Sequence, residues 1–256
     1  LGLSATPKNK KDERNLVLTE VMGRVIAKSE SINLAPRIEV FETGLIPAGK
    51  PPKLWIYAIK SLCNNRKRNI MIVKEVFNDL RNGRKAVLIP VSFTKHIEEL
   101  VEMINRQADY NNRHKGENWP TVMAVPYYGG MTDKAKDAAM ADFDKGRAKV
   151  MVAVTSMVVE GVDLSIPDTL YQVIPMSGKE GVGAPAFEQL TFRVSTPAPG
   201  ETDPVVKVFV DGLPQSYWCF RSTFQFEVSP GIALENKKYR MKKSDFLRAK
   251  QICDEL

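Results

Sequence analysis

The hydrophobic positions change their spacing along the chain in a regular order, which predicts alternating strands and helices. Short apolar runs such as 86–91 (AVLIPV) and 149–154 (KVMVAV) are typical of strands that are buried on both faces. Longer segments with apolar residues at helical spacing lie between them. We expect strands at residues 37–43, 86–91, 122–125, 149–154, 170–174 and 205–210. We expect helices at residues 53–63, 69–80, 94–104, 132–143, 185–193 and 242–256.

Strands that alternate with helices predict an α/β fold, in which helices cover both faces of a parallel sheet. Residues 53–212 form this domain in our interpretation, and residues 213–256 form a C-terminal extension. Residues 1–52 are rich in turn residues and are interpreted as a linker with one strand in it. The polar stretch 109–119 is interpreted as a loop. The chain begins with LGLS, which is typical of the middle of a buried strand, so we expect a fragment of a longer product.

Composition excludes several classes of protein. The 256 residues are 43% hydrophobic and 26% charged, as in an ordinary globular chain. No run approaches the ~18 apolar residues of a membrane span, and no apolar N-terminal segment indicates a secretory signal. Three distant cysteines and two histidines exclude a disulfide framework, a zinc ribbon and a histidine-cluster metal site. We therefore expect no metal site in this chain and a reducing, cytoplasmic setting.

The net charge of +7 is concentrated in the first quarter of the chain. Residues 1–70 contain 13 Lys and Arg against 6 Asp and Glu. A local basic excess attracts phosphate backbones, which favours a nucleic-acid partner. The alternative is a solvated surface, and charge alone favours that alternative.

Candidate chemistry lies after the predicted strand 149–154, because parallel sheets bind ligands at the carboxyl ends of their strands. The hydroxyls of Thr155 and Ser156 can hydrogen-bond a phosphate, and Gly161 lets the backbone approach a ligand. Asp163 can accept a hydrogen bond from a ribose hydroxyl. The alternative is a helix cap followed by a turn, and this segment alone favours it.

Gln189 and Arg193 stand four residues apart on a predicted helix, so they point in the same direction. An arginine in such a place can stabilise a transferring phosphate as an arginine finger. The alternative is an ordinary surface pair. The preceding loop 177–185 (SGKEGVGAP) matches neither phosphate-loop spacing, so we interpret it as a surface loop.

Taken in order, these segments resemble the second motor lobe of superfamily 2 helicases, the DEAD/DEAH-like group. Each motif is weak alone, but five in order are a strong signal. The matching segments are 1–7 (LGLSATP) for motif III, 87–92 for motif IV, 128–143 for the segment that follows it, 154–163 for motif V and 189–197 for motif VI. Two departures lie in motif VI, where Phe192 replaces a glycine and Thr196 replaces the final arginine. The ending RVSTP (193–197) resembles variants in phage-encoded helicases.

The resemblance implies a RecA-like parallel sheet and an ATP-dependent helicase or translocase, with ATP bound between this lobe and a first lobe. It implies that the first lobe, which is missing here, supplies the phosphate loop and the carboxylates that hold Mg²⁺. It implies Arg193 as the catalytic residue and single-stranded or duplex nucleic acid, DNA in preference to RNA, as the partner. If the protein is phage-encoded, its setting is the host cytoplasm. The implied ATP site comprises Gly161, Asp163, Gln189 and Arg193, and the implied nucleic-acid site comprises Ser92, Gly129, Gly130, Thr155 and Ser156.

Other interpretations remain open. One is a RecA-like module that binds nucleic acid without catalysis. A small-molecule enzyme is disfavoured because no complete cofactor fingerprint is present. The aromatic segment 217–226 is either a base-stacking platform or a packed core, and a core is favoured. The basic run 237–243 is equally consistent with a nucleic-acid grip and a solvated linker.

Overall fold

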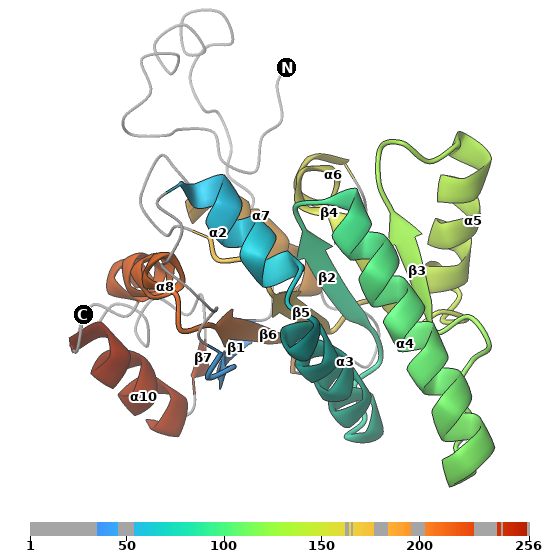
Figure 1. Ribbon diagram of the computed structural model, residues 1–256, viewed down its shortest axis with the longest axis horizontal. Coiled ribbons are helices and arrows are strands. Elements are labelled where there is room, and N and C mark those ends of the chain that lie inside the picture. Colours follow the sequence, from blue (N-terminus) through green and yellow to red (C-terminus); the bar gives the residue numbers. More distant parts are fainter. Residues whose placement is uncertain are drawn as a thin grey trace, which may run out of the picture.

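The structure is a computed structural model that describes residues 35–45, 54–161, 164, 166–176, 184–195, 203–227, 240–241 and 243–254. These residues form one parallel sheet in the order β3-β4-β2-β5-β6-β1-β7, with helices on both faces (Figure 1). The predicted α/β class and the parallel sheet are therefore confirmed. The strands are β1 (Arg37–Glu42), β2 (Val87–Val91), β3 (Ala124–Tyr127), β4 (Val150–Val154), β5 (Thr169–Gln172), β6 (Val205–Val210) and β7 (Arg240–Met241).

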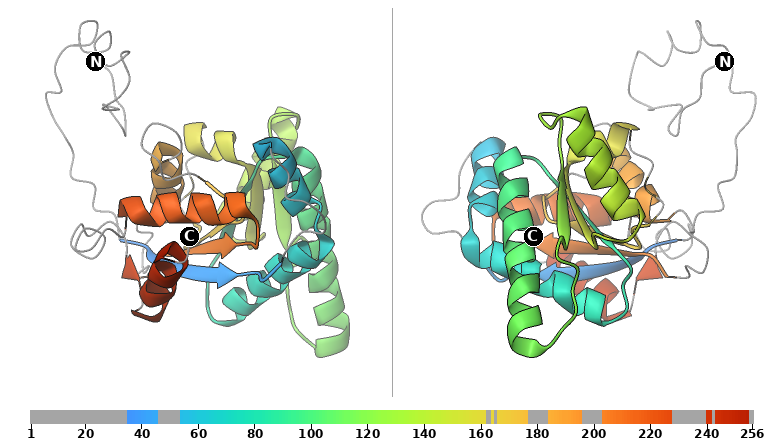
Figure 2. Two further views of the ribbon diagram at one scale, coloured as in Figure 1. Left: turned by 60° about the vertical axis from the view of Figure 1, so that its left-hand side comes forward. Right: turned by 90° about the vertical axis from the view of Figure 1, so that its right-hand side faces the viewer.

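Alternation along the strands divides the core into two layers. In β4, Val150 and Val152 face the layer that contains α2, α3 and α4, whereas Met151 and Ala153 face the opposite layer. That opposite layer is formed by α5, α6, α7, α8 and α10, and Figure 2 shows the two sets of helices on either side of the sheet. The helices are α2 (Trp55–Cys63), α3 (Arg66–Arg81), α4 (Thr94–Lys115), α5 (Asp133–Asp144), α6 (Thr155–Gly161), α7 (Ala184–Ser195), α8 (Pro214–Glu227) and α10 (Lys243–Asp254).

The sheet takes in strands from outside the range 53–212. Strand β1 pairs with β6, with Ile38 opposite Val206, although β1 comes from the segment interpreted as a linker. Helices α8 and α10 pack on the same core through buried residues such as Phe220 and Ile252. The core interpretation of the aromatic segment is confirmed at Cys219 and Phe220, which are buried, and is wrong at Trp218, which is exposed.

Helix α4 is longer than predicted, and the interpretation of 109–119 as a loop is wrong for its first half. The helix continues to Lys115 because polar side chains support its exposed face. Arg106 pairs with Glu102 at 2.6 Å and Arg113 pairs with Asp109 at 2.7 Å, each across one helical turn. The helix ends at Gly116, whose φ of +66° is one that glycine adopts readily.

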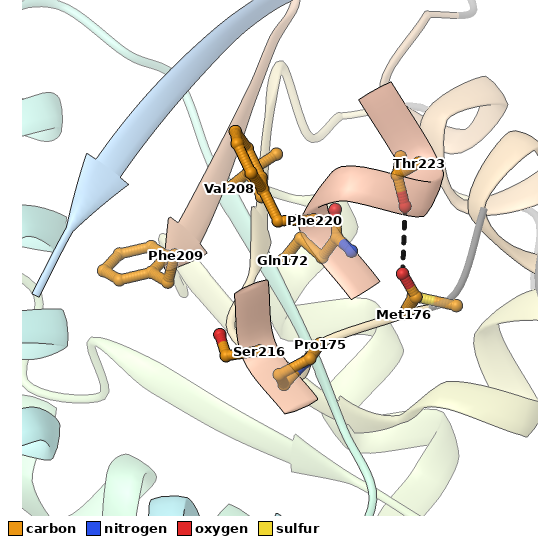
Figure 3. Close-up of a pocket in the computed structure, with 8 residues that line it drawn as sticks. All are labelled: Gln172, Pro175, Met176, Val208, Phe209, Ser216, Phe220 and Thr223. Carbon is orange, nitrogen blue, oxygen red and sulfur yellow. Dashed lines mark hydrogen bonds between the residues drawn. The ribbon is translucent and has the colours of Figure 1, made fainter. Parts of the chain in front are cut away.

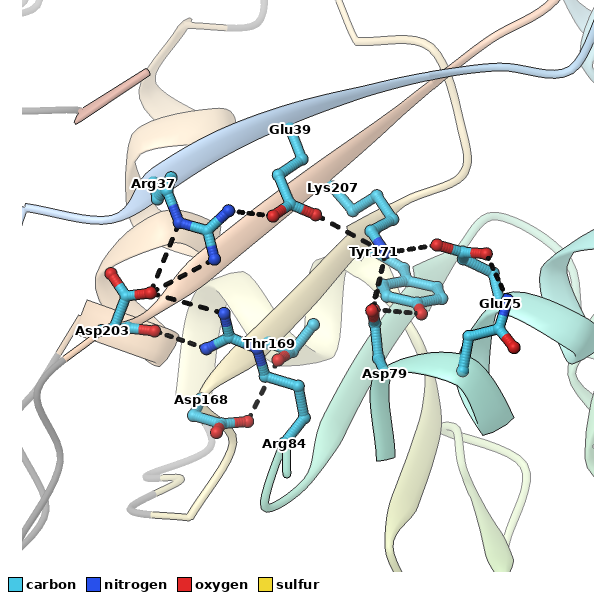
Figure 4. A network of polar contacts seen from close by, with 11 residues as sticks. Arg37, Glu39, Glu75, Asp79, Arg84, Asp168, Thr169, Tyr171, Asp203 and Lys207 are labelled. Carbon is cyan, nitrogen blue, oxygen red and sulfur yellow. Dashed lines mark hydrogen bonds and ion pairs between the residues drawn. The ribbon is translucent and has the colours of Figure 1, made fainter. Parts of the chain in front are cut away.

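A buried lysine ties α3 to the centre of the sheet (Figure 4). Lys207 of β6 lies in register between Glu39 of β1 and Tyr171 of β5. Its Nζ lies 2.6 Å from Glu75 and 2.8 Å from Asp79, both on α3, and the Tyr171 hydroxyl donates to Asp79 at 2.5 Å. Burial is the largest single effect and lowers the pKa of Lys207, but the hydrogen bonds to Asp79 and Glu75 and the charges of these carboxylates together outweigh burial and raise it. The lysine is therefore held in its charged form.

No helix in the part of the chain that the structure describes has the length and apolar character to cross a bilayer.

Candidate functional site

Three neighbouring strands bring the predicted nucleic-acid residues to one edge of the sheet. Strands β3, β4 and β2 are adjacent and parallel, so their carboxyl ends share an edge. Neighbouring strands are ~5 Å apart, so the three ends span about 10 Å. All but Thr155 of the predicted residues at these ends are exposed. Ser92 follows β2, Gly129 and Gly130 follow β3, and Thr155 and Ser156 follow β4.

The two glycines form an open turn after β3. The N–H of Met131 donates to the carbonyl of Tyr128 at 3.2 Å and closes the turn. Neither glycine has a positive φ, so the backbone conformation does not require glycine here. A Cβ on Gly129 would only reach ordinary contact with the Met157 sulfur at 4.0 Å. What the glycines provide is bare backbone that a large ligand can approach.

The two hydroxyls after β4 differ in what they can do. Thr155 Oγ1 donates to the carbonyl of Val91 at 3.1 Å, which ties the end of β4 to the end of β2. Its proton is thus engaged within the protein. Ser156 is exposed beside it, so its hydroxyl can donate outward.

Helix α6 joins the predicted nucleic-acid residues to the predicted catalytic arginine. It begins with Thr155 and Ser156 and ends at Gly161. Arg193 of α7 is half-buried against it: Nε donates to the carbonyl of Val158 at 3.0 Å and Nη2 donates to that of Val159 at 3.2 Å. The arginine therefore caps carbonyl groups in the helix that carries the two hydroxyls.

The structure describes only some of the remaining residues of the predicted ATP site. Gln189 lies one turn before Arg193 on α7, and Gly161 is the last residue of α6. Asp163 lies outside the described residues, as do the motif III-like segment 1–7 and most of the loop 177–185. Among the described residues, no group of three His, Cys, Asp or Glu side chains is placed to hold a metal ion.

The sequence analysis missed a buried polar cluster at the carboxyl ends of β1, β5 and β6. Arg68 and Asp211 both have 0% exposed side chains, and Arg68 Nε lies 2.8 Å from Asp211 Oδ1. Arg68 also donates to the carbonyl of Val173, and Thr43 donates to Asp211 Oδ1 at 2.7 Å. Arg68 precedes Ile72 by one helical turn, on the buried stripe of α3, and this spacing is the signal that could have identified it.

A buried histidine adjoins the cluster. His96 Nε2 lies 3.1 Å from Asn69 Oδ1, and Asn69 donates its amide to the carbonyl of Cys63 at 2.9 Å. Burial, together with repulsion from Arg68, lowers the pKa of His96 to about 3. His96 is therefore neutral near pH 7.

A small cavity lies between the carboxyl ends of β5 and β6 and helix α8 (Figure 3). Thr223 of α8 closes one side by donating to the carbonyl of Met176 at 3.0 Å. The cavity volume is about 10 Å³, room for about one water molecule and not for a nucleotide. Its lining residues are Gln172, Pro175, Met176, Val208, Phe209, Ser216, Phe220 and Thr223.

Solved structures share this architecture. *Saccharomyces cerevisiae* Dbp5 bound to RNA and ADP BeF3 matches with a TM-score of 0.54 at 11% identity, over 94% of this chain and 52% of that chain. Its L327V variant, also bound to RNA and ADP BeF3, matches with a TM-score of 0.50 at 12% identity, over 88% and 46%. This chain has a RecA-like α/β fold. Identities this low show the fold alone, and the chain spans about half of the Dbp5 chain.

A third match is the *Mycobacterium smegmatis* helicase Lhr bound to ssDNA and AMP-PNP. Its TM-score is 0.49 at 15% identity, over 77% of this chain and 22% of that chain. Neither a scan against protein-family models nor a search of the curated proteins finds a match to the sequence.

Proposed function

We propose that this chain is the second motor lobe of an ATP-dependent nucleic-acid helicase or translocase of superfamily 2. The observation that carries the proposal is the single edge on which three strand ends gather exposed donors, joined through α6 to Arg193. The fold likeness to Dbp5 supports the architecture. A first lobe would supply the phosphate loop and the carboxylates for Mg²⁺.

The nucleic-acid strand would lie across the carboxyl ends of β2, β4 and β3. Ser92, Ser156 and the backbone of Gly129 and Gly130 would donate to its phosphates, while Thr155 holds two of the strand ends together. Contacts to phosphates position a strand without reading its sequence. We therefore expect sequence-tolerant binding that weakens with salt.

The ATP side would comprise Gly161, Asp163, Gln189 and Arg193. The described residues fit a phosphate chain, because a guanidinium and an amide project from the same side of α7. Bound ATP would supply the free energy of phosphoryl transfer. Arg193 would neutralise charge on the phosphates, and Gly161 would allow close approach of the backbone.

Helix α6 would couple the two ligands. The Nε–H and one Nη2–H of Arg193 are engaged by the carbonyls of Val158 and Val159, so a phosphate that takes these two donors would compete with the carbonyls. A phosphate that draws the guanidinium away would leave these carbonyls without their present partner. The position of α6, and with it the orientation of Ser156, would then depend on the nucleotide.

A charge introduced at the edge tests the nucleic-acid site. We expect Ser156→Glu to weaken binding of a fluorescent dT20 strand by ~10-fold, because the carboxylate repels phosphates. Ser244→Glu on α10 is the matched control, since it adds the same charge at another exposed serine. Equal affinity of the two variants for the strand would show that nucleic acid does not bind at this edge.

The second candidate, a nucleic-acid module without catalysis, is favoured by the engagement of Arg193 within the protein. In that case this chain contributes no catalytic group, so Arg193→Ala would make no difference to ATP hydrolysis by a protein that joins this chain to its first lobe. The motor proposal predicts a loss of hydrolysis with nucleic-acid binding nearly intact.

A further inference from the structure

Helix α2 begins with four consecutive large hydrophobic residues that are all exposed. The exposed fractions are 61% for Leu54, 43% for Trp55, 45% for Ile56 and 55% for Tyr57. Single exposed hydrophobic residues are common, but a contiguous exposed group marks a surface that interacts with something. The proposed contacts at the carboxyl edge do not use these side chains.

The same part of the chain carries only positive charge. Between Glu42 and Glu75 there is no acidic residue, and there are seven Lys and Arg residues. Four of them are exposed, and no ion pair joins any of the four to a carboxylate within the described part of the chain. These four are Lys60, Arg66, Lys67 and Lys74.

The exposed aromatic side chains lie in the first turn of α2, on different sides of the helix. Tyr57 is opposite the buried Ile59 and Cys63, whereas Trp55 precedes Ile59 by one turn and is exposed in the first turn of the same stripe. Lys60 Nζ lies 5.9 Å from the centroid of the Tyr57 ring, so the two side chains lie together. A two-residue turn then leads to the exposed Arg66 and Lys67 at the start of α3. We call this set the α2 surface: Leu54, Trp55, Ile56, Tyr57, Lys60, Arg66 and Lys67.

The α2 surface adjoins the candidate edge. Ile59 and Cys63 of α2 belong to the same packed cluster as Ile97 and Leu100 of α4. Figure 2 shows α2 next to the amino-terminal part of α4, the helix that begins just after Ser92. A strand that crosses Ser92 would reach the α2 surface past this part of α4.

We infer that the α2 surface is a second contact for single-stranded nucleic acid, with bases stacked on Trp55 and Tyr57 and phosphates held by Lys60, Arg66 and Lys67. Exposed aromatic rings beside a basic track are the features that bind single strands without sequence preference. The inference rests on the proposed function, because it requires a nucleic-acid partner.

The net charge of the chain's own N-terminal segment argues against this segment as the partner that covers the α2 surface. Residues 1–34 contain six Lys and Arg against four Asp and Glu, so the segment has the same sign as the α2 surface. A polyanion complements this surface, and a weakly basic segment does not.

Tryptophan fluorescence provides the direct test, with dT12 and U12 as probes that distinguish DNA from RNA. The chain contains three tryptophans: Trp55, Trp119 and Trp218. If an oligonucleotide binds, we expect it to quench the tryptophan fluorescence of the wild type and of the Trp218→Phe variant. We expect Trp55→Phe to lose the change while its Kd stays within ~2-fold, because a phenylalanine ring still stacks. Binding without quenching in the wild type would overturn the inference and favour a protein, such as a first lobe, as the partner.

Affinity provides the second readout. The double variant Trp55→Ala/Tyr57→Ala should raise the Kd by at least ~10-fold, which equals ~1.4 kcal/mol. Tyr110→Ala and Trp218→Ala remove exposed aromatic rings elsewhere and should change the Kd by less than ~2-fold. Far-UV circular dichroism confirms that each variant is folded.

Ser156→Glu separates failure of the inference from failure of the proposed function. If Ser156→Glu weakens binding and the double variant does not, the inference is overturned and the proposed edge stands. If only the double variant weakens binding, the α2 surface is upheld and the edge is overturned. If the wild type binds neither oligonucleotide, both are overturned.

Discussion

Replacing Arg68 by methionine should strongly destabilise the protein, because it leaves a buried carboxylate without its cation. Arg68 and Asp211 have fully buried side chains, and their closest atoms are 2.8 Å apart. Methionine preserves much of the apolar stem but removes the donors to Asp211 and to the carbonyl of Val173. Asp211 would keep the hydrogen bond from Thr43, while its Oδ2 has no side-chain or backbone partner among the described residues.

Breaking a buried ion pair by removing one partner costs about 3–5 kcal/mol. We expect Arg68→Met to lower the free energy of unfolding by this amount, measured by urea denaturation with linear extrapolation. The corresponding fall in Tm is ~6–20 °C for a chain of this size. Lys67→Met is the matched control, because Lys67 is exposed and adjacent; its effect should stay within ~0.5 kcal/mol.

A double-mutant cycle distinguishes the ion pair from lost packing. Asp211→Asn removes the carboxylate charge, so in the Arg68→Met background it should restore more than ~1.5 kcal/mol. Additive effects of the two substitutions, or a loss below ~1 kcal/mol for Arg68→Met, would refute the reasoning. Either result would mean that the guanidinium is hydrated and that α3 is packed on the sheet in another way.

Three further predictions concern other described side chains. Lys207→Met should lower the free energy of unfolding by about 3 kcal/mol in urea denaturation, because Glu75 and Asp79 lose their cation; a loss under ~1 kcal/mol would contradict the network. Burial lowers the pKa of His96 in the folded state to about 3, so the stability that the neutral His96 contributes is fully present above pH 6.5. This stability is lost as the pH falls from 6.5 toward 3. This loss should reach about 3 kcal/mol between pH 6.5 and pH 4, and a His96→Gln variant whose stability has the same pH dependence as the wild type would disprove it. In a protein that contains the first lobe, Arg193→Ala should reduce ATP turnover by ~10³-fold and Arg193→Lys should restore little, as measured by steady-state ATPase assays with saturating single strand; wild-type turnover would count against the arginine-finger role.

Strand positions could be predicted from the sequence because burial on both faces leaves a continuous apolar run. Residues 205–210 were predicted as a strand and form β6 with the same bounds. The end of α4 and all of α8 were not predicted as helix. In α4 the last turns are held by polar pairs, which a hydrophobic period does not detect. In α8 the aromatic residues obscure the helical spacing, although Cys219 and Phe220 are buried.

The candidate site was partly accessible from the sequence for a related reason. The rule that parallel strands present ligands at their carboxyl ends pointed to Thr155 and Ser156, and the family resemblance added Ser92, Gly129 and Gly130; the structure brings these residues to one edge of the sheet. The partners of Thr155 and Arg193 were not accessible, because each depends on which neighbouring strand or helix packs alongside. The exposure of Trp55 was likewise not accessible from the sequence, because it depends on how α2 packs.

The central claim is that a nucleic-acid strand lies across the carboxyl ends of β2, β4 and β3. Amide hydrogen exchange of the chain with and without saturating dT20 tests this claim most directly. The account predicts slower exchange in peptides that cover residues 128–131 and 155–157, with no change at the far end of α4 near residues 109–115. Tight binding of dT20 with unchanged exchange at 128–131 and 155–157 would contradict it.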